Sequence, residues 1–399
     1  MRPALALACA ALACTTHAKR PSPAAEPFNY QGYFASYPTG LRLVAYRTWE
    51  VKRATVLASY DAGEADDPPG KEGLARLTAR LTAVAAPARG GLELRERLFA
   101  AGAIDSTNVL ADATEFRSIV RLARLDEALA IEADRLRDPL AGITAEDVAR
   151  EREQLALELA ADPAASELAA VLALASRGTR YDRAPPTAAS VRALTLDDAR
   201  EWAREHLVPP RLVLVVSGPE TPSAAGRRVL ATFGALAATG APDEPRVPPA
   251  ARPPAPPRVP VLSSALETLH VPGATPHLWI AWPLPGETDG TAASAFAATV
   301  VLDRRLRGRA EYGDVARRVR GITVSLRRRH DASALLARVE LRGAEDAAPV
   351  RDALVAAARD KRPLADGGQL GLVRSLAQTI HGNGVWNMEE GVPGDAAWL

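Results

Sequence analysis

Histidines are the first residues to consider for metal chemistry, because imidazole is the commonest protein ligand of transition metals. No two of the six histidines are three or four residues apart, so no helix can present two of them on one face. His270 and His277 bracket a predicted strand start and could approach each other, although polar residues at strand edges explain them more simply. The six are His17, His206, His270, His277, His330 and His381.

Motifs for other chemistries are also missing. The sequence has no Gly-x-Ser-x-Gly nucleophile elbow, no phosphate-binding Walker loop and no Gly-x-Gly-x-x-Gly fingerprint. What remains is charge at helical spacing. Arg76 and Arg80 are four residues apart in a predicted helix over 70–85, and Glu151 and Glu158 are two turns apart in another. On spacing alone, each pair could equally be a solvated charged face.

Composition indicates an ordinary globular protein of two domains. The chain has 399 residues, of which 47% are hydrophobic, enough to bury a sizeable core. Its 49 Lys and Arg residues balance 48 Asp and Glu residues, which excludes a broadly basic nucleic-acid binder. Only 5% of residues are aromatic, so platforms for stacking bases are not expected either.

The N-terminus predicts export. Arg2 precedes an apolar run over 4–14 that is too short to span a bilayer but fits a secretory signal peptide. Cys9 and Cys14, the two cysteines of the chain, both lie in this run, which resembles a bacterial lipoprotein signal with Cys14 as the lipidation candidate. Ala11 stands where such signals usually have Leu, so ordinary cleavage after Ala13 or Ala18 is the alternative. If Cys14 is lipidated or removed, the folded part has no free thiol, so no disulfide or cysteine-based zinc site is expected.

Proline-rich segments divide the rest of the chain. Residues 240–260 contain too many prolines for a helix or a sheet and predict an extended linker. The predicted organisation is a signal peptide over 1–18, a tether over 19–35, an N-terminal domain over 36–239, a linker over 240–262 and a C-terminal domain over 263–399.

Both predicted domains mix strands and helices. In the first, 41–48 and 54–61 predict two paired strands, 106–122 further extended chain, and 211–218 a buried strand. Capping boxes at Thr144-x-x-Asp147 and Thr195-x-x-Asp198 predict helix starts, and the first of these helices should end before Pro163. The second domain predicts strands and helices over 277–283, 291–306, 322–329, 333–342, 347–358 and 367–379.

An internal repeat is indicated by the order of elements. Residues 60–81 and 282–302 both give a strand, an acidic turn and a long helix. The predicted fold class is therefore α+β, with two domains that each pack helices on a mainly antiparallel sheet.

Residues 61–81 resemble the signature region of the insulinase/pitrilysin zinc metallopeptidases, which include the mitochondrial processing peptidases. The similarity continues through 111–116, like the family's strand beside bound substrate, and 151–160, like the helix with the third zinc ligand. It extends to 217–220 and 276–285, so that most of residues 36–330 is covered in the family's order. The resemblance implies two insulinase-like domains that face each other across a cavity.

The resemblance also implies that the catalytic motif is lost. Where the family has H-x-x-E-H, this chain has Arg76, Ala79 and Arg80, and the third-ligand position is Glu158. A guanidinium offers no lone pair to zinc, and alanine cannot accept a proton. No cofactor is therefore expected, although zinc is the family's metal. We expect Arg76 or Arg80 to pair with Glu151 and Glu158 where the zinc would lie.

The family's substrate-binding Arg and Tyr correspond here to Arg317 and Val324, and residues 387–399 lack the usual last helix and strand, which predicts a shortened C-terminal domain. The expected function is that of a non-catalytic subunit of the periplasm or outer membrane. Its partner would be an active homologue with H-x-x-E-H, and together they would hold extended peptides. A peptidase with unrecognised ligands and an envelope scaffold without a peptide role are the alternatives. No nucleic acid is expected, and membrane contact only through a lipid anchor.

Overall fold

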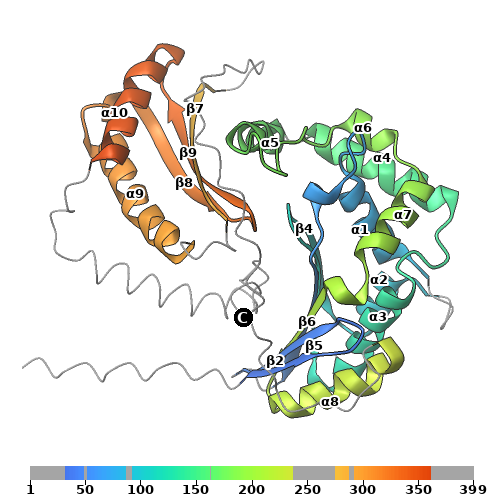
Figure 1. The fold of residues 1–399 in the computed structure, drawn as a ribbon. Coiled ribbons are helices and arrows are strands. Elements are labelled where there is room, and N and C mark those ends of the chain that lie inside the picture. The colour runs from blue at the N-terminus through green and yellow to red at the C-terminus, as the bar shows by residue number, and fades with distance from the viewer. Residues whose placement is uncertain are drawn as a thin grey trace, which may run out of the picture. The chain divides into compact units, whose positions relative to one another are not determined.

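The computed structural model describes residues 32–48, 52–86, 92–161, 163–236, 275–286 and 292–360. Within these residues the chain forms two sheets, each with its own helices (Figure 1). The signal peptide, Cys14, the predicted linker over 240–262 and the predicted helix over 367–379 lie outside the described residues. No helix in the described part is both long enough and apolar enough to cross a membrane.

The first sheet has six strands in the order β1-β2-β6-β3-β5-β4. Every pairing is antiparallel except that of β2 with β6, which is parallel. The strands are β1 Gly32–Ser36, β2 Arg42–Arg47, β3 Arg53–Tyr60, β4 Ile104–Val109, β5 Thr114–Arg121 and β6 Leu212–Gly218.

Two sequence predictions need correction in this sheet. The strands near 41–48 and 54–61 form, but they do not pair, because β6 lies between them and pairs with both. Its run of Leu and Val residues is buried on both faces, which favours a central position over an edge. The tether was predicted to extend to residue 35, whereas Gly32–Ser36 form β1 and pair with β2. The other domain limits stay predictions.

Strand alternation determines which side chains meet the helices. On β6, Leu214 and Val216 join the main core, while Val213 and Val215 belong to a small apolar cluster that includes Tyr46. The helices cover the face that holds the main core (Figure 1). The helices with residues in this core are α1 Leu74–Val84, α3 Leu125–Arg137, α4 Ala145–Ala161, α6 Ala188–Arg192, α7 Leu196–His206 and α8 Pro222–Phe233. Helix α2 Leu94–Ala100 packs against α3, and α5 Pro163–Ala175 contributes no residue to this core.

Helix ends follow the capping signals in the sequence. The Thr144 and Asp147 side chains exchange backbone hydrogen bonds at the start of α4, and Thr195 and Asp198 do the same for α7. As predicted, α4 ends at Ala161, before Pro163. By contrast, α1 begins at Leu74 and not at residue 70, because Gly73 takes a left-handed conformation with φ +97°.

The second sheet repeats part of the first. Its order β7-β9-β8 matches β3-β5-β4: a first strand, then a helix, then a hairpin whose second strand pairs with the first. A helix follows the hairpin in both cases. Helices α9 and α10 lie along one face of this sheet (Figure 1). The elements are β7 His277–Pro285, α9 Ala292–Tyr312, β8 Val319–Arg327, β9 Ala332–Leu341 and α10 Ala347–Arg359.

Candidate functional site

The N-terminus of α1 is fixed by one buried carboxylate. Asp67 accepts hydrogen bonds from the backbone N–H groups of Gly73, Leu74 and Ala75 at 2.8, 3.1 and 2.8 Å. These are N–H groups that a helix start leaves without partners. Burial raises the pKa of Asp67 to about 7, against the opposing effect of the three N–H donors. The first turn of α1 is thereby fixed, and with it the directions of Arg76 and Arg80.

Arg80 lies between α1 and α4. Its Nη1 and Nη2 donate to the two carboxylate oxygens of Glu158 at 2.9 and 2.7 Å, a bidentate pair. Its Nε, which is buried and has no hydrogen-bond partner, lies 3.7 Å from Oε2 of Glu151. One guanidinium thus contacts two carboxylates that lie two turns apart on α4.

The two carboxylates differ in their exposure to water. The Glu151 side chain is 5% exposed, whereas that of Glu158 is 53% exposed. Glu151 also has the Nε of Arg150 at 3.5 Å. Removal of the Glu158 carboxylate should therefore change stability little, because water already solvates it. The buried Glu151 carboxylate instead needs Arg80 and Arg150 to balance its charge.

Arg76 does not join this group. Its Nε donates to Glu64, which lies in the short helix Glu64–Asp66 that follows β3. Ala79, at the position of the family's general base, is 1% exposed and packs in the main core. Of the two arginines proposed to pair with α4, the structure places Arg80 there and turns Arg76 toward the end of β3.

A small pocket lies beside Arg76. It has a volume of about 120 Å³ and extends from the start of α1 to α5 and the segment that follows α5. Arg76, Arg183 and Arg329 line it, together with acidic and apolar residues. Sequence analysis missed Arg183 and Arg329, because no local pattern around either one indicates a site.

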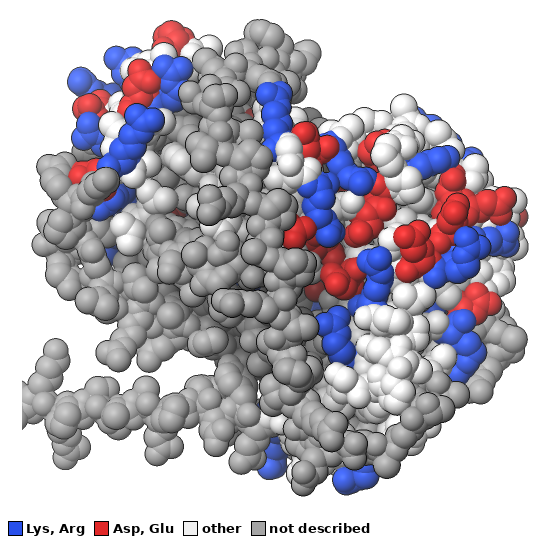
Figure 2. Space-filling view, in the orientation of Figure 1, with Lys and Arg blue, Asp and Glu red and all other residues white. Residues whose placement is uncertain are grey.

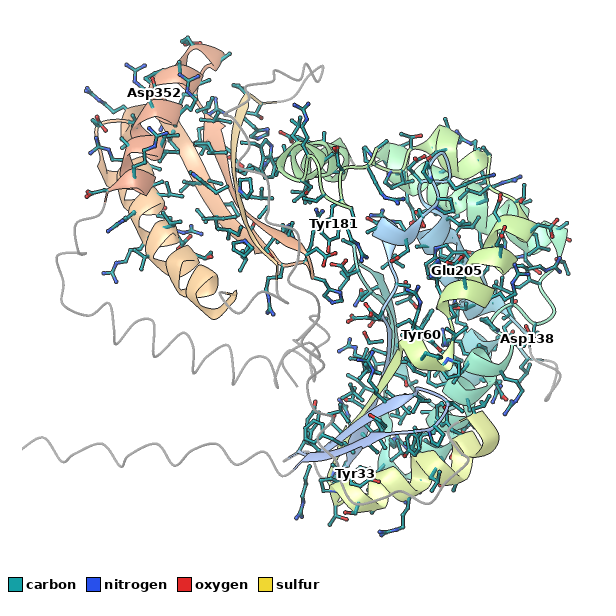
Figure 3. The ribbon with its side chains drawn as sticks, viewed as in Figure 1. Tyr33, Tyr60, Asp138, Tyr181, Glu205 and Asp352 are labelled. Atoms are coloured by element: carbon teal, nitrogen blue, oxygen red, sulfur yellow. The ribbon has the colours of Figure 1, made fainter. Side chains whose placement is uncertain are left out.

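Tyr181 connects this region to the turn after β4. It lies in the segment that follows α5 (Figure 3), and its hydroxyl donates to Oδ1 of Asp112 at 2.7 Å. The same hydroxyl accepts from the backbone N–H of Asp331 at 3.1 Å. Arg180 lies 3.0 Å from Oδ1 of Asp112, so this buried carboxylate has both a phenol and a guanidinium partner. The contacts hold the turn after β4 in place next to the pocket.

Strand β4 is at the edge of the first sheet among the described strands. No described strand pairs with its outer edge. The strand carries the polar residues Asp105 and Asn108 and the exposed Ile104. An edge strand has main-chain N–H and C=O groups that can pair with another extended chain. Ala111, two residues beyond β4, lines the pocket.

Arg317 is exposed, in the short helix Ala316–Arg318 just before β8. Val324, where the family's Tyr is expected, packs against the core of the second sheet and faces Ala337 across the strands. The structure therefore does not bring Arg317 together with the Arg80 group through any contact that it describes.

The residues at the resembling positions do not fit zinc. Within the described ranges, no three His, Cys, Asp or Glu residues gather closely enough to hold a metal ion. The two carboxylates of α4 that could serve as ligands face the Arg80 guanidinium, which carries a charge of the same sign as the metal. No step of chemistry through zinc is derived for this chain.

The fold and the helix pair can now be compared with known proteins. Residues 193–312 match the family model described as the Peptidase M16 inactive domain. This part of the chain is therefore similar to an M16 domain. The match begins after Glu158, so it does not extend to Arg76, Ala79 or Arg80. No curated protein is similar enough in sequence to match.

Solved structures share the fold of this chain at low sequence identity. A protease from Helicobacter pylori is 16% identical, with a TM-score of 0.70 over 90% of this chain and 86% of its own. An M16 inactive domain from Pseudomonas fluorescens is 17% identical, with a TM-score of 0.67 over 87% and 83%. The periplasmic protease PqqL from Escherichia coli is 17% identical, with a TM-score of 0.63 over 91% of this chain and 41% of its own.

Proposed function

We propose that this chain is an exported, non-catalytic M16-type subunit that pairs with an active zinc peptidase and helps to hold extended peptides. The observation that carries the proposal is the Arg80 guanidinium, which contacts Glu158 and Glu151 where the family resemblance expects a metal. A fixed cation in this place satisfies the α4 carboxylates without zinc. The description of the matched family model as an inactive domain also supports a non-catalytic chain.

Peptide binding is supported by the edge strand. An extended peptide could add to β4 through main-chain hydrogen bonds, a common mode of recognition that needs no particular sequence. The Asp112, Tyr181 and Arg180 contacts hold the turn at the end of this strand, so that its edge keeps its geometry. Binding of peptide and loss of hydrolysis are compatible, because the strand and the metal position are separate features.

Export is supported by the signal-like N-terminus and by the likeness to PqqL, which is a periplasmic protease. Lipidation of Cys14 would attach the subunit to a membrane surface. The mixed charge on the surface of this chain also fits a protein partner and not a nucleic acid. Figure 2 shows acidic and basic side chains interspersed on the visible face of the N-terminal part, with no large area of one sign.

The decisive experiment is affinity purification of the tagged full chain from its native envelope, followed by identification of the proteins recovered. We expect a homologue that carries H-x-x-E-H, in amounts close to those of the tagged chain. The same tag on an unrelated exported protein is the control. Recovery of stable envelope proteins without any peptidase would support the scaffold alternative and overturn the pairing.

A second measurement addresses activity. The purified chain alone should not cleave unfolded protein, and it should raise the activity of the recovered homologue on peptides when the two are mixed. Chelator-sensitive hydrolysis by the chain alone would instead support the alternative of a peptidase with unrecognised ligands.

A further inference from the structure

Two arginines of the pocket lack a carboxylate partner. Arg183 donates only to main-chain carbonyl oxygens, those of Arg180 and Asp67. Arg329 donates to the Ser176 hydroxyl at 2.8 Å and lies over the Tyr181 ring, 4.7 Å from its centroid. No carboxylate of a described residue is within 4 Å of either guanidinium. Both side chains are only partly exposed.

A cation held away from water without a counter-charge is unfavourable. Burial lowers the pKa of Arg329, which shows that its charge is poorly hydrated in the folded chain. The nearest acidic groups that act on it, Asp112 and Glu64, do so from beyond ion-pair distance. The pocket therefore contains positive charge that an anion could neutralise.

The acidic residues of the pocket are already engaged. Glu64 pairs with Arg76, and Asp67 accepts three backbone N–H groups at the start of α1. Glu72 accepts the backbone N–H of Gly70 at 2.9 Å. Of the acidic residues that line the pocket, only Glu72 has neither a cation nor a helix N-terminus among the described residues to balance its charge. The two positive charges of Arg183 and Arg329 therefore exceed this one negative charge.

The remaining wall of the pocket is apolar. Leu159 from α4 and Leu172 and Ala173 from α5 line it. A volume of about 120 Å³ accommodates a carboxylate with a small side chain. Guanidinium groups are well suited to such a ligand, because their planar donors match the two oxygens of a carboxylate.

We propose that Arg183 and Arg329 bind a peptide carboxylate in the pocket beside Arg76, with a small apolar side chain against Leu159 and Leu172. The inference rests on the proposed peptide-binding function and specifies the chemistry of the ligand. The carboxylate can be a free C-terminus or an acidic side chain. Because Ala111 lines the pocket just beyond β4, a peptide along the edge strand would reach it.

The test uses two small probes on the full chain. N-acetylalanine carries the carboxylate and a small apolar side chain, and N-acetylalanine amide has the same shape without the charge. In titration calorimetry we expect the acid to bind at least about ten-fold more tightly than the amide, the factor expected for a charged hydrogen-bonded pair. Added salt should reduce the difference.

Variants assign the binding to the pocket. Arg183→Gln and Arg329→Gln should each remove most of the ten-fold preference, and Arg329→Lys should retain part of it because the charge remains. The matched control is Arg200→Gln, which changes an exposed arginine on α7 that does not line the pocket. It should bind the acid as the unmodified chain does. Two variants are used so that a folding defect in one does not decide the result.

Fluorescence anisotropy with labelled alanine- and serine-rich peptides separates the two sources. A free C-terminus should bind more tightly than its amide if the C-terminus is the ligand, and an amide with one internal glutamate should do so if a side chain is. Equal binding of acid and amide, no binding of either small probe, or an unchanged preference in both Gln variants would overturn the inference. Failure to recover a peptidase partner would overturn the proposed pairing instead and leave these titrations unaffected.

Discussion

Replacement of Arg80 by leucine should destabilise the chain, because this substitution leaves the buried Glu151 with less compensating charge. The Glu151 side chain is 5% exposed, and its remaining cation would be Arg150, whose Nε lies 3.5 Å away. Loss of one member of a buried ion pair lowers the free energy of unfolding by roughly 3–5 kcal/mol. Because Arg80 is itself 23% exposed and Arg150 stays, we expect a loss at or just below the lower limit of this range, about 2–3 kcal/mol.

Glu158→Gln should have a much smaller effect. The Glu158 carboxylate is 53% exposed, so water replaces the lost pair and salt already screens it. For exposed pairs the contribution is about 0–1 kcal/mol, and the bidentate geometry places Glu158 near the upper end. The double variant Arg80→Leu with Glu151→Leu should recover most of the loss, since apolar residues can replace a buried pair at little cost.

Urea unfolding followed by circular dichroism measures these differences, with the slope compared between variants to detect changes in the unfolded state. The control is Arg192→Gln, which breaks the exposed bidentate pair with Glu153. A Glu158→Gln loss as large as that of Arg80→Leu would refute the argument. A double variant Arg80→Leu with Glu151→Leu that lost as much stability as the Arg80→Leu and Glu151→Leu single variants lose together would also refute the argument.

Three further outcomes are expected. After dialysis against excess zinc, elemental analysis should find no stoichiometric metal, while restoration of H-x-x-E-H at 76–80 should produce zinc binding. Burial lowers the pKa of His206, so stability should fall as pH drops below the unfolded value of about 6.5, and His206→Leu should remove this part of the pH dependence in urea unfolding at about pH 7.5 and 5. Gly63→Ala would place a Cβ 2.2 Å from the Leu110 carbonyl oxygen and should lower stability by about 3 kcal/mol in thermal unfolding, whereas Gly308→Ala, in open space on α9, should be neutral or stabilising.

The sequence predicts the local elements because their signals are local. The capping boxes at Thr144 and Thr195 mark real helix starts, and the Leu and Val run of β6 marks a real buried strand. Strand pairing is different, because β6 enters the sheet from more than a hundred residues away, between β2 and β3. Nothing in either of those two strands records that neighbour, so sequence order suggested the wrong pairing.

The helix faces were predictable and the exposure of their residues was not. Helical spacing places Arg80, Glu151 and Glu158 on facing surfaces once α1 and α4 pack together. How deeply each carboxylate is buried depends on what covers each turn of α4, which spacing does not contain. Which of the two arginines would pair with α4 was not predictable for a related reason. Glu64 comes close to Arg76 only because the chain turns after β3, and the sequence gives no sign of that approach.

The two arginines of α1 thus have separate consequences. Arg80 contacts Glu151 and Glu158 of α4, and in the proposed function its charge takes the place of a metal. Arg76 lines the pocket, and its charge is balanced by Glu64. The pocket arginines whose charge has no carboxylate partner among the described residues are Arg183 and Arg329. The carboxylate pocket that we propose is therefore a feature separate from the helix pair that Arg80 holds together. Under our proposal, the chain holds a peptide end or an acidic residue in this pocket and does not cut the peptide.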